Sequence, residues 1–337
     1  MTDKSFAEIG KVEAIRELFK GTPYKAFSTC RFEAPGREYV SHFSRVLLEG
    51  IDFNLVYFPL KHLGYKSVLS VSGELLAQQA RPNTLSVNLG ISSKLDLEQI
   101  RELWSGMVTA AREFGYKSVY LDLNPSRNGL CISVSATGET SLLNTRRRPA
   151  PKSKDLICVS GALGAAYMGM QILEKELVRF NEGEHSDRNK ILERNKMLVG
   201  AYLKPELPSS LVQQFENSEI SPSSGYFITH GLADTLKRLS ADTGLGAKVY
   251  ADKIPFEGNT FQLGRELNID PISAAMNGGE DYKLLFTVPI LQLDKFRHDF
   301  QTFDIIGHLA QKEAGTVLVL PDGREMPLRA QGWREEE

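Results

Sequence analysis

The chain has 337 residues, of which 42% are apolar and 24% charged, a composition typical of a globular protein with room for two domains. Its 40 basic and 42 acidic residues give a formal net charge of −2, so there is no electrostatic reason to expect nucleic acid or an anionic membrane as its partner. The three cysteines, Cys30, Cys131 and Cys158, form no C-x-x-C pair, so neither a disulfide framework nor a zinc site is expected. This cysteine usage and the absence of a signal-like N-terminal segment favour a cytoplasmic location.

One helix is well defined by the first half of the sequence. From Asp96 to Phe114, apolar residues recur at helical spacing and form one stripe. Asp96 and Gln99 have the spacing of a capping box, and Gly115 is a natural stop. Another helix is expected near Phe6–Phe19. Short β-rich runs predict strands at Ser67–Ser72, Thr84–Leu89, Ser118–Leu123 and Leu130–Ala136. A helix among several strands predicts a layered αβ domain.

The composition changes at Arg146–Lys154, a basic stretch with two prolines that we expect to be an exposed connection between domains 1–148 and 149–337. The 18 residues Leu156–Leu173 carry no charge and approach the length of a membrane span. Their glycines and Gln171 favour a buried strand, a glycine turn and a buried helix instead. The remaining predicted elements are a loop at Asn181–Lys190, helices at Ser209–Asn217 and Gly231–Ala241, and strands at Lys283–Val288 and Thr316–Leu320.

Several motifs with well-understood chemistry are absent from the sequence. There is no G-x-x-x-x-G-K-[ST] phosphate loop, no G-x-G-x-x-G fingerprint and no G-x-S-x-G nucleophile elbow. The six histidines are scattered and form no H-x-x-x-H pair, so none stands out as a metal ligand.

Three segments are unusual enough to carry functional information. The first combines L-E-G-I-D-F at Leu48–Phe53 with Y-F-P-L-K-H-L-G-Y-K at Tyr57–Lys66. The second is D-L-I-C-V-S-G-A-L-G-A-A-Y-M-G at Asp155–Gly169, and the third is N-G-G-E-D-Y at Asn277–Tyr282. In the third segment, a glycine pair lets the backbone approach a ligand closely while the carboxylates of Glu280 and Asp281 hydrogen-bond it. Taken alone, the same residues describe a glycine turn with solvated acids.

In their order and spacing, these segments resemble thiamine-monophosphate kinase, of the aminoimidazole ribonucleotide synthetase-like superfamily. The resemblance extends from about Tyr24 to Trp333. It implies a two-domain α/β (α+β) fold, with an N-terminal αβ domain that dimerises through its sheet and a C-terminal αβ domain. It also implies an Mg-ATP-dependent transfer of a phosphoryl group to thiamine monophosphate, giving the diphosphate.

The carboxylates that such a kinase needs are largely missing. Phosphoryl transfer depends on Mg²⁺, which prefers several hard oxygen ligands. The family's G-I-G-D-D-A-A corresponds to Lys25–Arg31, where both aspartates are gone and Ser28 and Thr29 stand nearby. Its T-T-D becomes Phe43-Ser44-Arg45, and its D-I-S-D-G-L becomes F-I-T-H-G-L at Phe227–Leu232, so that the second aspartate is His230.

Two carboxylates persist as candidate metal ligands. The family's N-L-S-D becomes V-S-G-E at Val71–Glu74, which leaves Glu74, and its G-G-D-T-T becomes Y-L-D-L-N at Tyr120–Asn124, which keeps Asp122. The resemblance also implies candidate nucleotide-binding residues, namely Asp122, Arg148 and Arg45, and candidate substrate-binding residues, namely Asp52, Glu280 and Trp333. Asp52 stands in place of the family's histidine.

Three functional hypotheses follow. The leading one is a non-catalytic paralogue of the kinase that acts as a binding or scaffolding protein and needs no cofactor. The alternative is an active but divergent kinase, which requires Mg²⁺ and ATP. The third is a metal-free enzyme on the same scaffold. The expected partners are a second copy of the chain, a genuine kinase of the family, or a small phosphate ester that hydroxyls and arginines bind directly. Neither nucleic acid nor a membrane is expected.

Overall fold

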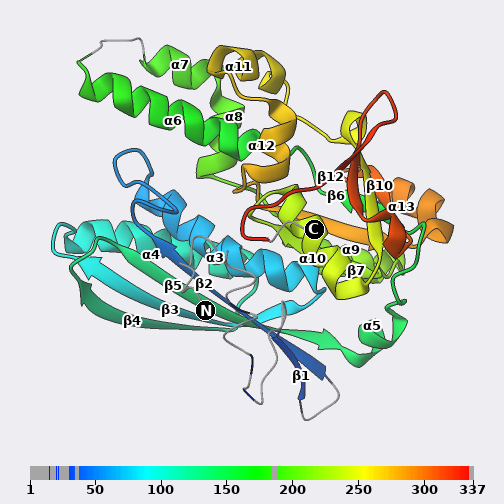
Figure 1. Ribbon diagram of the computed structural model, residues 1–337. Helices are drawn as coiled ribbons and strands as arrows, with labels where there is room; N and C mark the ends of the chain where they lie inside the picture. The colour runs from blue at the N-terminus through cyan, green and yellow to red at the C-terminus, as the bar shows by residue number, and fades with distance from the viewer. Residues whose placement is uncertain are drawn as a thin grey trace.

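The computed structural model describes residues 30–34, 38–183 and 188–333, together with the single positions 15, 20 and 22. Two β-sheets with packed helices make up the described chain, one sheet from residues before Arg148 and one from residues after it. Figure 1 shows the first sheet at the bottom, the second at the right and a group of helices above them. This mixed αβ architecture with two sheets confirms the predicted fold class. The predicted helix near Phe6–Phe19 and the segment Lys25–Thr29 lie outside the described residues, apart from position 15.

The first sheet has five strands. Their order is β1 (Cys30–Ala34), β2 (Glu38–Leu48), β5 (Cys131–Ser141), β3 (Arg81–Ser92) and β4 (Ser118–Ser126). All neighbours are antiparallel except β3 and β4, which are parallel because helix α4 (Leu97–Glu113) connects them as a crossover. Along β5, half-buried and fully buried positions alternate, as expected where one face of a sheet packs on a core. Helix α3 (Leu60–Ala77) packs on that face, with α4 beside it.

The other face of this sheet, called here the polar face, carries mainly hydroxyl and amide side chains. The strand register aligns Ser44, Ser135, Ser86 and Tyr120 in one row, and Val46, Ser133, Asn88 and Asp122 in the next. Ser44 and Ser135 are 2.9 Å apart, and Thr84 and Thr137 2.6 Å, through their hydroxyl oxygens.

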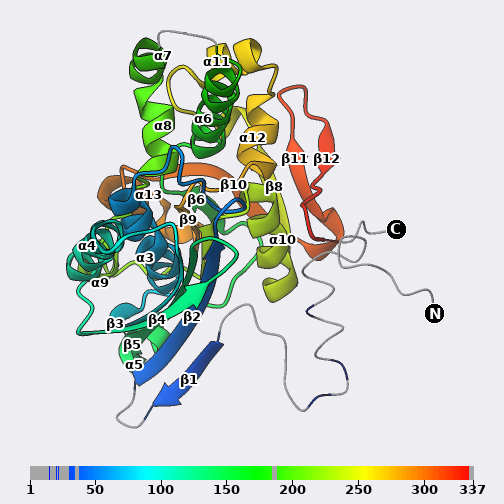
Figure 2. The ribbon, with the colours of Figure 1, turned by 90° about the vertical axis from the view of Figure 1, so that its left-hand side faces the viewer.

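The second sheet has seven strands, and helices pack around it. The strand order is β12 (Glu325–Pro327), β11 (Thr316–Val319), β8 (Gly246–Tyr250), β10 (Asp304–Ala310), β6 (Leu156–Val159), β9 (Lys283–Val288) and β7 (Ser224–Ile228). Helix α5 (Leu142–Arg147) contacts β5 and β2 of the first sheet. The helices that follow it are α6 (Ala165–Asn181), α7 (Arg188–Arg194), α8 (Lys196–Leu203), α9 (Leu211–Ser218), α10 (Leu232–Thr243), α11 (Thr260–Leu267), α12 (Pro271–Asn277) and α13 (Leu293–Asp299). Short 3-10 turns span Ala251–Lys253, Ile290–Gln292 and Lys312–Ala314. Figure 2 shows α6, α7, α8, α11 and α12 as one group, set apart from the first sheet.

Helix α4 confirms the prediction made from its stripe and its cap. Asp96 accepts a hydrogen bond from the Gln99 backbone N–H at 2.8 Å, and the Gln99 side chain accepts one from the Asp96 N–H at 3.0 Å. The helix ends at Glu113, and Gly115 has a φ of 73°. Strand β9 has the predicted bounds, and Leu156–Leu173 forms β6, a glycine turn and the start of α6.

The strand predicted at Ser67–Ser72 is wrong, because these residues lie in the middle of α3. The helix is enclosed between the first sheet and strands β7 and β9 of the second (Figure 1). Almost every position from Leu63 to Ala77 is therefore buried, and no polar face remains to mark a helical period. The predicted loop at Asn181–Lys190 is shorter, since α6 reaches Asn181 and α7 begins at Arg188. None of the helices among the described residues is long and apolar enough to cross a membrane.

Helices α3 and α4 touch each other through reciprocal glycines. A Cβ atom added to Gly64 would overlap the carbonyl oxygen of Leu103, and one added to Gly106 would overlap that of Lys61. Since backbone atoms cannot move aside as a flexible side chain can, the close approach of α3 and α4 requires both glycines.

We expect Gly106→Ala to lower the free energy of unfolding by about 1–3 kcal/mol, because the added methyl group forces the two helices apart. Gly200→Ala is the matched control. Gly200 lies inside α8 with open space around the added Cβ, and the change should leave stability unchanged or raise it by up to ~1 kcal/mol. Denaturant unfolding followed by circular dichroism measures both values. Equal effects of the two substitutions would contradict the close α3–α4 packing.

Candidate functional site between the two sheets

Arg45 on β2 touches the segment that follows β7. Its Nη2 donates to Thr229 Oγ1 at 3.2 Å and lies 3.4 and 3.3 Å from Nδ1 and Nε2 of His230. The nearly equal distances place the guanidinium against the imidazole ring, not in line with one nitrogen. Within the described residues, no carboxylate comes within ion-pair distance of Arg45. The two positions at which the resembling family carries aspartates, Arg45 and His230, are thus direct neighbours.

A hydrogen-bond chain orients the exposed His230 ring. The Thr229 hydroxyl accepts from Arg45 and lies 2.9 Å from His230 Nδ1, and the ring tautomer decides which of these two groups donates. Arg45 therefore presents N–H donors at the edge of the inter-sheet region.

Lys66 on α3 is a fully enclosed ammonium group at the end of the segment Tyr57–Lys66, and it was not among the predicted site residues. Its Nζ is 2.7 Å from Glu280 Oε2 and donates to the Tyr202 carbonyl oxygen at 2.9 Å. Burial lowers the pKa of Lys66, and the charge of Glu280 opposes that shift. The signal in the sequence was a lone lysine within a run of apolar and small residues. A buried ion pair of this kind is costly to break, because either partner alone would be an uncompensated charge.

Asp52 lies near Lys66 and Glu280, and its carboxylate accepts a hydrogen bond within its own turn. Its Oδ2 accepts a hydrogen bond from the Leu48 backbone N–H at 2.7 Å, and its carbonyl oxygen accepts one from the Tyr202 hydroxyl at 3.4 Å. Burial raises the pKa of Asp52, the Leu48 hydrogen bond lowers it, and the nearby Glu280 raises it again. The structure thus brings Asp52 and Glu280, two of the three candidate substrate-binding residues, into one electrostatic neighbourhood with Arg45 and Lys66.

The third segment of the sequence forms a strained turn. Gly279, Glu280 and Tyr282 all have positive φ, of 78°, 64° and 51°, which is uncommon for residues other than glycine. Asp281 anchors the turn, since its carboxylate accepts hydrogen bonds from the backbone N–H groups of Gly164 and Ala166 at 2.9 and 3.3 Å. Burial raises the pKa of Asp281 to about 7, against the lowering effect of these two bonds. Asp281 thus fills the N-terminus of α6.

Glu74 lies elsewhere, where α3 meets β7. It lines a cavity of about 10 Å³ together with Gln78, Tyr226 and Arg238, and such a volume admits about one water molecule. The Phe227 ring fills the adjoining space, because a Cβ on Gly73 would overlap it. Phe227 stands where the family has its first D-I-S-D aspartate, and Gly73 where it has the serine of N-L-S-D.

Arg148 and Trp333, the candidate nucleotide-binding and substrate-binding residues, are each linked to a side chain that lines this cavity, Gln78 and Arg238 respectively. Arg148 Nη1 donates to Gln78 Oε1 at 3.3 Å, and the Gln78 amide donates to the carbonyl oxygen of Gly225 at 3.1 Å. Trp333 donates its indole N–H to Asp234 Oδ1 at 2.8 Å, and the other oxygen of Asp234 pairs with Arg238 at 2.7 Å.

Asp122 is on the polar face of the first sheet, whereas α3 with Glu74 packs on the opposite face. The Asp122 carboxylate accepts hydrogen bonds from the Leu123 backbone N–H at 3.0 Å and from the Asn124 side-chain amide at 3.1 Å. Within one chain, the two candidate metal ligands are therefore separated by the sheet.

The residues between the sheets do not fit Mg²⁺ within a single chain. The ion needs several oxygen ligands in near-octahedral geometry, but the neighbours Arg45 and His230 offer nitrogen, and Glu74 shares its small cavity with a cation. Among the described residues, no three His, Cys, Asp or Glu side chains gather closely enough to hold a metal ion.

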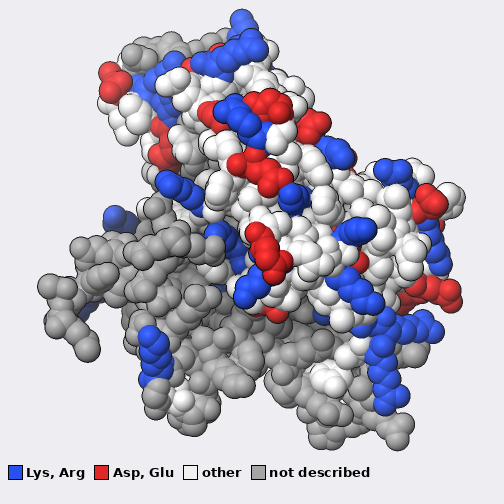
Figure 3. Space-filling view, turned by 45° about the vertical axis from the view of Figure 1, so that its right-hand side comes forward, with Lys and Arg blue, Asp and Glu red and all other residues white. Residues whose placement is uncertain are grey.

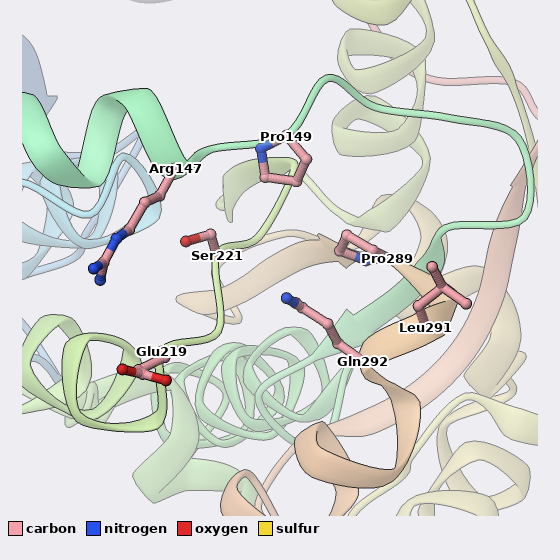
Figure 4. Close-up of a pocket in the computed structure, with 7 residues that line it drawn as sticks. All are labelled: Arg147, Pro149, Glu219, Ser221, Pro289, Leu291 and Gln292. Carbon is pink, nitrogen blue, oxygen red and sulfur yellow. The ribbon is translucent and has the colours of Figure 1, made fainter.

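Two further surface features lie apart from this region. A hollow of about 450 Å³ is bounded by Arg147 and Glu219 on one side and by Pro289 and Leu291 on the other (Figure 4). None of these residues belongs to the contacts described above. Figure 3 shows acidic and basic side chains interspersed over the described part of one face of the molecule.

Comparison with known proteins connects the chain to one family by sequence and fold. No protein-family model matches it. It is 28% identical to the thiamine-monophosphate kinase of Pyrococcus horikoshii over 272 residues, covering 80% of this chain and 78% of that protein. It is 25% identical to the thiamine-monophosphate kinase of Aquifex aeolicus over 293 residues, covering 86% and 85%. The solved complex of AaThiL with AMPPCP and TMP superposes with a TM-score of 0.79 at 21% identity and covers 99% of each chain. The chain is thus related in sequence to thiamine-monophosphate kinases over most of its length, and it shares the fold of the AaThiL complex over nearly all of it.

Proposed function

We propose that this chain is a member of the thiamine-monophosphate kinase family that has lost Mg-ATP-dependent phosphoryl transfer and acts as a binding or scaffolding protein. The contact of Arg45 with Thr229 and His230 carries the proposal. Cationic and neutral nitrogen groups stand together there, at two positions where the family supplies carboxylates. A guanidinium about 4 Å from a divalent ion opposes its binding by about 8 kcal/mol at an effective dielectric constant of 20, before screening. A single carboxylate at the same distance would only cancel this repulsion and would leave no net attraction for the ion.

Packing supports the same proposal. The small cavity beside Glu74 is far below the 300–1,000 Å³ or so that small-molecule sites occupy, and Phe227 with Gly73 fills the adjoining space. Asp52 and Glu280 are already engaged by the Leu48 N–H and by Lys66. In this proposal the retained motifs stabilise the fold, and the protein requires neither Mg²⁺ nor ATP. We also propose that the chain consists of two domains, 1–148 and 149–337.

The proposed binding partners are a second copy of the chain and a small phosphate ester. The polar face of the first sheet carries the exposed apolar side chains of Val46, Leu48 and Tyr120, which a second sheet would cover. A genuine kinase of the family would be an alternative partner at this face. A phosphate ester would contact Arg45 beside the His230 ring, because guanidinium N–H groups bind phosphate oxygens without a metal.

The runner-up is an active, divergent thiamine-monophosphate kinase in which Glu74 and Asp122 hold the metal. The exposure of Asp122 on the polar face favours it, because a second chain at that face could approach this carboxylate. The relatives are named as kinases of thiamine monophosphate, and the AaThiL complex contains AMPPCP and TMP.

The full chain with Mg-ATP and thiamine monophosphate should form no thiamine diphosphate above background, since the developing charge on the transferred group is not neutralised. The Pyrococcus horikoshii relative, assayed in parallel, is the positive control. Chromatographic detection of the diphosphate is the measurement. Turnover on the order of 1 s⁻¹ that is lost in the Glu74→Ala or Asp122→Ala variant would instead support the active-kinase hypothesis.

Binding of ATP should be independent of Mg²⁺, or weakened by it, because the metal competes with Arg45 for phosphate oxygens. Isothermal titration in Mg²⁺ and in EDTA measures this. Arg45→Ala should weaken binding by about tenfold or more, whereas Arg101→Ala, an exposed arginine paired with Glu98 on α4, should not. Tighter binding in Mg²⁺ would contradict the phosphate site, and absence of binding in both buffers would leave only the scaffold.

Self-association should depend on the polar face. The double substitution Val46→Glu and Tyr120→Glu places negative charges on the polar face, one on β2 and one on β4. In a dimer the charged faces of the two chains would repel, so the assembly should shift toward monomer in sedimentation equilibrium. Val56→Glu, at a similarly exposed valine outside the sheet, should leave the mass unchanged. A wild-type chain that is monomeric at micromolar concentration would rule out the dimer.

A further inference from the structure

The ammonium group of Lys66 sits in a socket of aromatic rings and oxygen atoms. Its Nζ lies 4.0 Å from the centroid of the Tyr202 ring, 5.1 Å from that of Tyr282 and 5.4 Å from that of Phe58. Glu280 and the Tyr202 carbonyl oxygen complete the socket at 2.7 and 2.9 Å. Lys66 comes from α3, whereas Tyr202, Tyr282 and Glu280 belong to the second half of the chain.

This composition is selective for a cation. Aromatic faces within about 6 Å attract a positive charge through their quadrupoles, and the attraction grows when water is excluded. The carboxylate and the carbonyl oxygen both accept hydrogen bonds from an ammonium group. A methyl group has a similar size but cannot donate to them. A neutral occupant would therefore leave the buried Oε2 atom of the half-buried Glu280 without a positive partner.

Contacts other than those to Lys66 hold the socket walls. Phe58 packs edge-on against Tyr202 at 5.4 Å, and Tyr282 packs edge-on against Phe227 at 5.2 Å. Glu280 is fixed by the positive-φ turn and by its backbone N–H, which donates to the Thr229 carbonyl oxygen at 2.8 Å. The Tyr282 hydroxyl is fully buried and has no hydrogen-bond partner among the described residues. The walls thus remain in place when the lysine side chain is shortened.

We propose that Phe58, Tyr202, Tyr282 and Glu280 form a binding site for primary alkylammonium ions, which the chain keeps closed with its own Lys66. The lysine joins the first half of the chain to the second by occupying the site as an internal ligand. An external alkylammonium ion binds only where that side chain is absent or withdrawn. This inference does not rest on the proposed function and holds whether or not the chain transfers phosphate.

Lys66→Ala opens the site to a probe of matching shape, since n-propylammonium replaces the atoms from Cγ to Nζ. We expect the full-length variant to bind n-propylammonium in calorimetric titration at least about tenfold more tightly than the neutral isostere 1-propanol. The thermal unfolding midpoint of the variant should rise with n-propylammonium and not with 1-propanol. The wild-type chain should respond to neither compound. Equal binding of the two probes to the folded variant would overturn the proposal.

The double variant Lys66→Ala, Glu280→Gln tests the source of the selectivity, because the carboxylate is replaced by a neutral group of similar shape. It should lose most of the preference for n-propylammonium over 1-propanol, and an undiminished preference would overturn the proposal. If the single variant fails to fold alone, expression and purification in n-propylammonium should restore soluble, folded chain, and 1-propanol should not. Failure of the ammonium ion to rescue it would equally count against the site.

Discussion

The enclosure of α3 between two sheets is the constraint on which the rest of the molecule depends. A helix with no side facing water must satisfy every polar side chain internally. Ser67, Ser70 and Ser72 do so by donating to carbonyl oxygens of the preceding turn, at 2.7, 2.6 and 2.9 Å. Lys66 cannot, and it reaches across to Glu280. The same enclosure makes one core of the two halves, because Leu69 of α3 and Phe286 of the second sheet belong to a single buried cluster.

Once the helix is held in this way, small changes along it decide how much space remains between the sheets. Gly73 has no side chain, and the ring of Phe227 occupies the room thus left. In the family's pattern, a serine and an aspartate stand at these two positions. A glycine and an aromatic ring at these positions bury apolar surface where the family's pattern has polar groups, and such burial is favourable by roughly 25 cal/mol per Å² of apolar area. The proposed loss of catalysis therefore has two supports, the filled space beside Gly73 and the positive charge at Arg45.

Elements defined by local signals could be predicted from the sequence. The cap at Asp96 and the stripe behind it depend on residues a few positions apart, and α4 forms where they indicate. The α3 segment could not be predicted, because its periodic signal vanishes when both sides are buried. The partnership of Lys66 with Glu280 joins residues from distant parts of the chain, and no spacing rule connects them. The face on which Asp122 lies depends on the strand register, since a shift of one residue would turn it to the other side. The resemblance placed Arg45 and His230 at related positions, but only the fold puts them in contact.

In several places the chain supplies from its own residues the group that a ligand would otherwise bring. Asp281 provides the anion at the N-terminus of α6, and Lys66 provides the cation among the aromatic rings. Asp52 likewise gives its carboxylate to a backbone N–H of its own turn. Binding free energy for an external ligand comes from groups left unsatisfied in the free protein, so each internal match stabilises the fold and removes a contact that a substrate could use. Arg45 is the exception, because no carboxylate among the described residues pairs with it and its neighbours are a hydroxyl group and an imidazole. A guanidinium without a salt bridge attracts anions, so the Arg45 edge is a place between the sheets where an anionic ligand has a contact to gain.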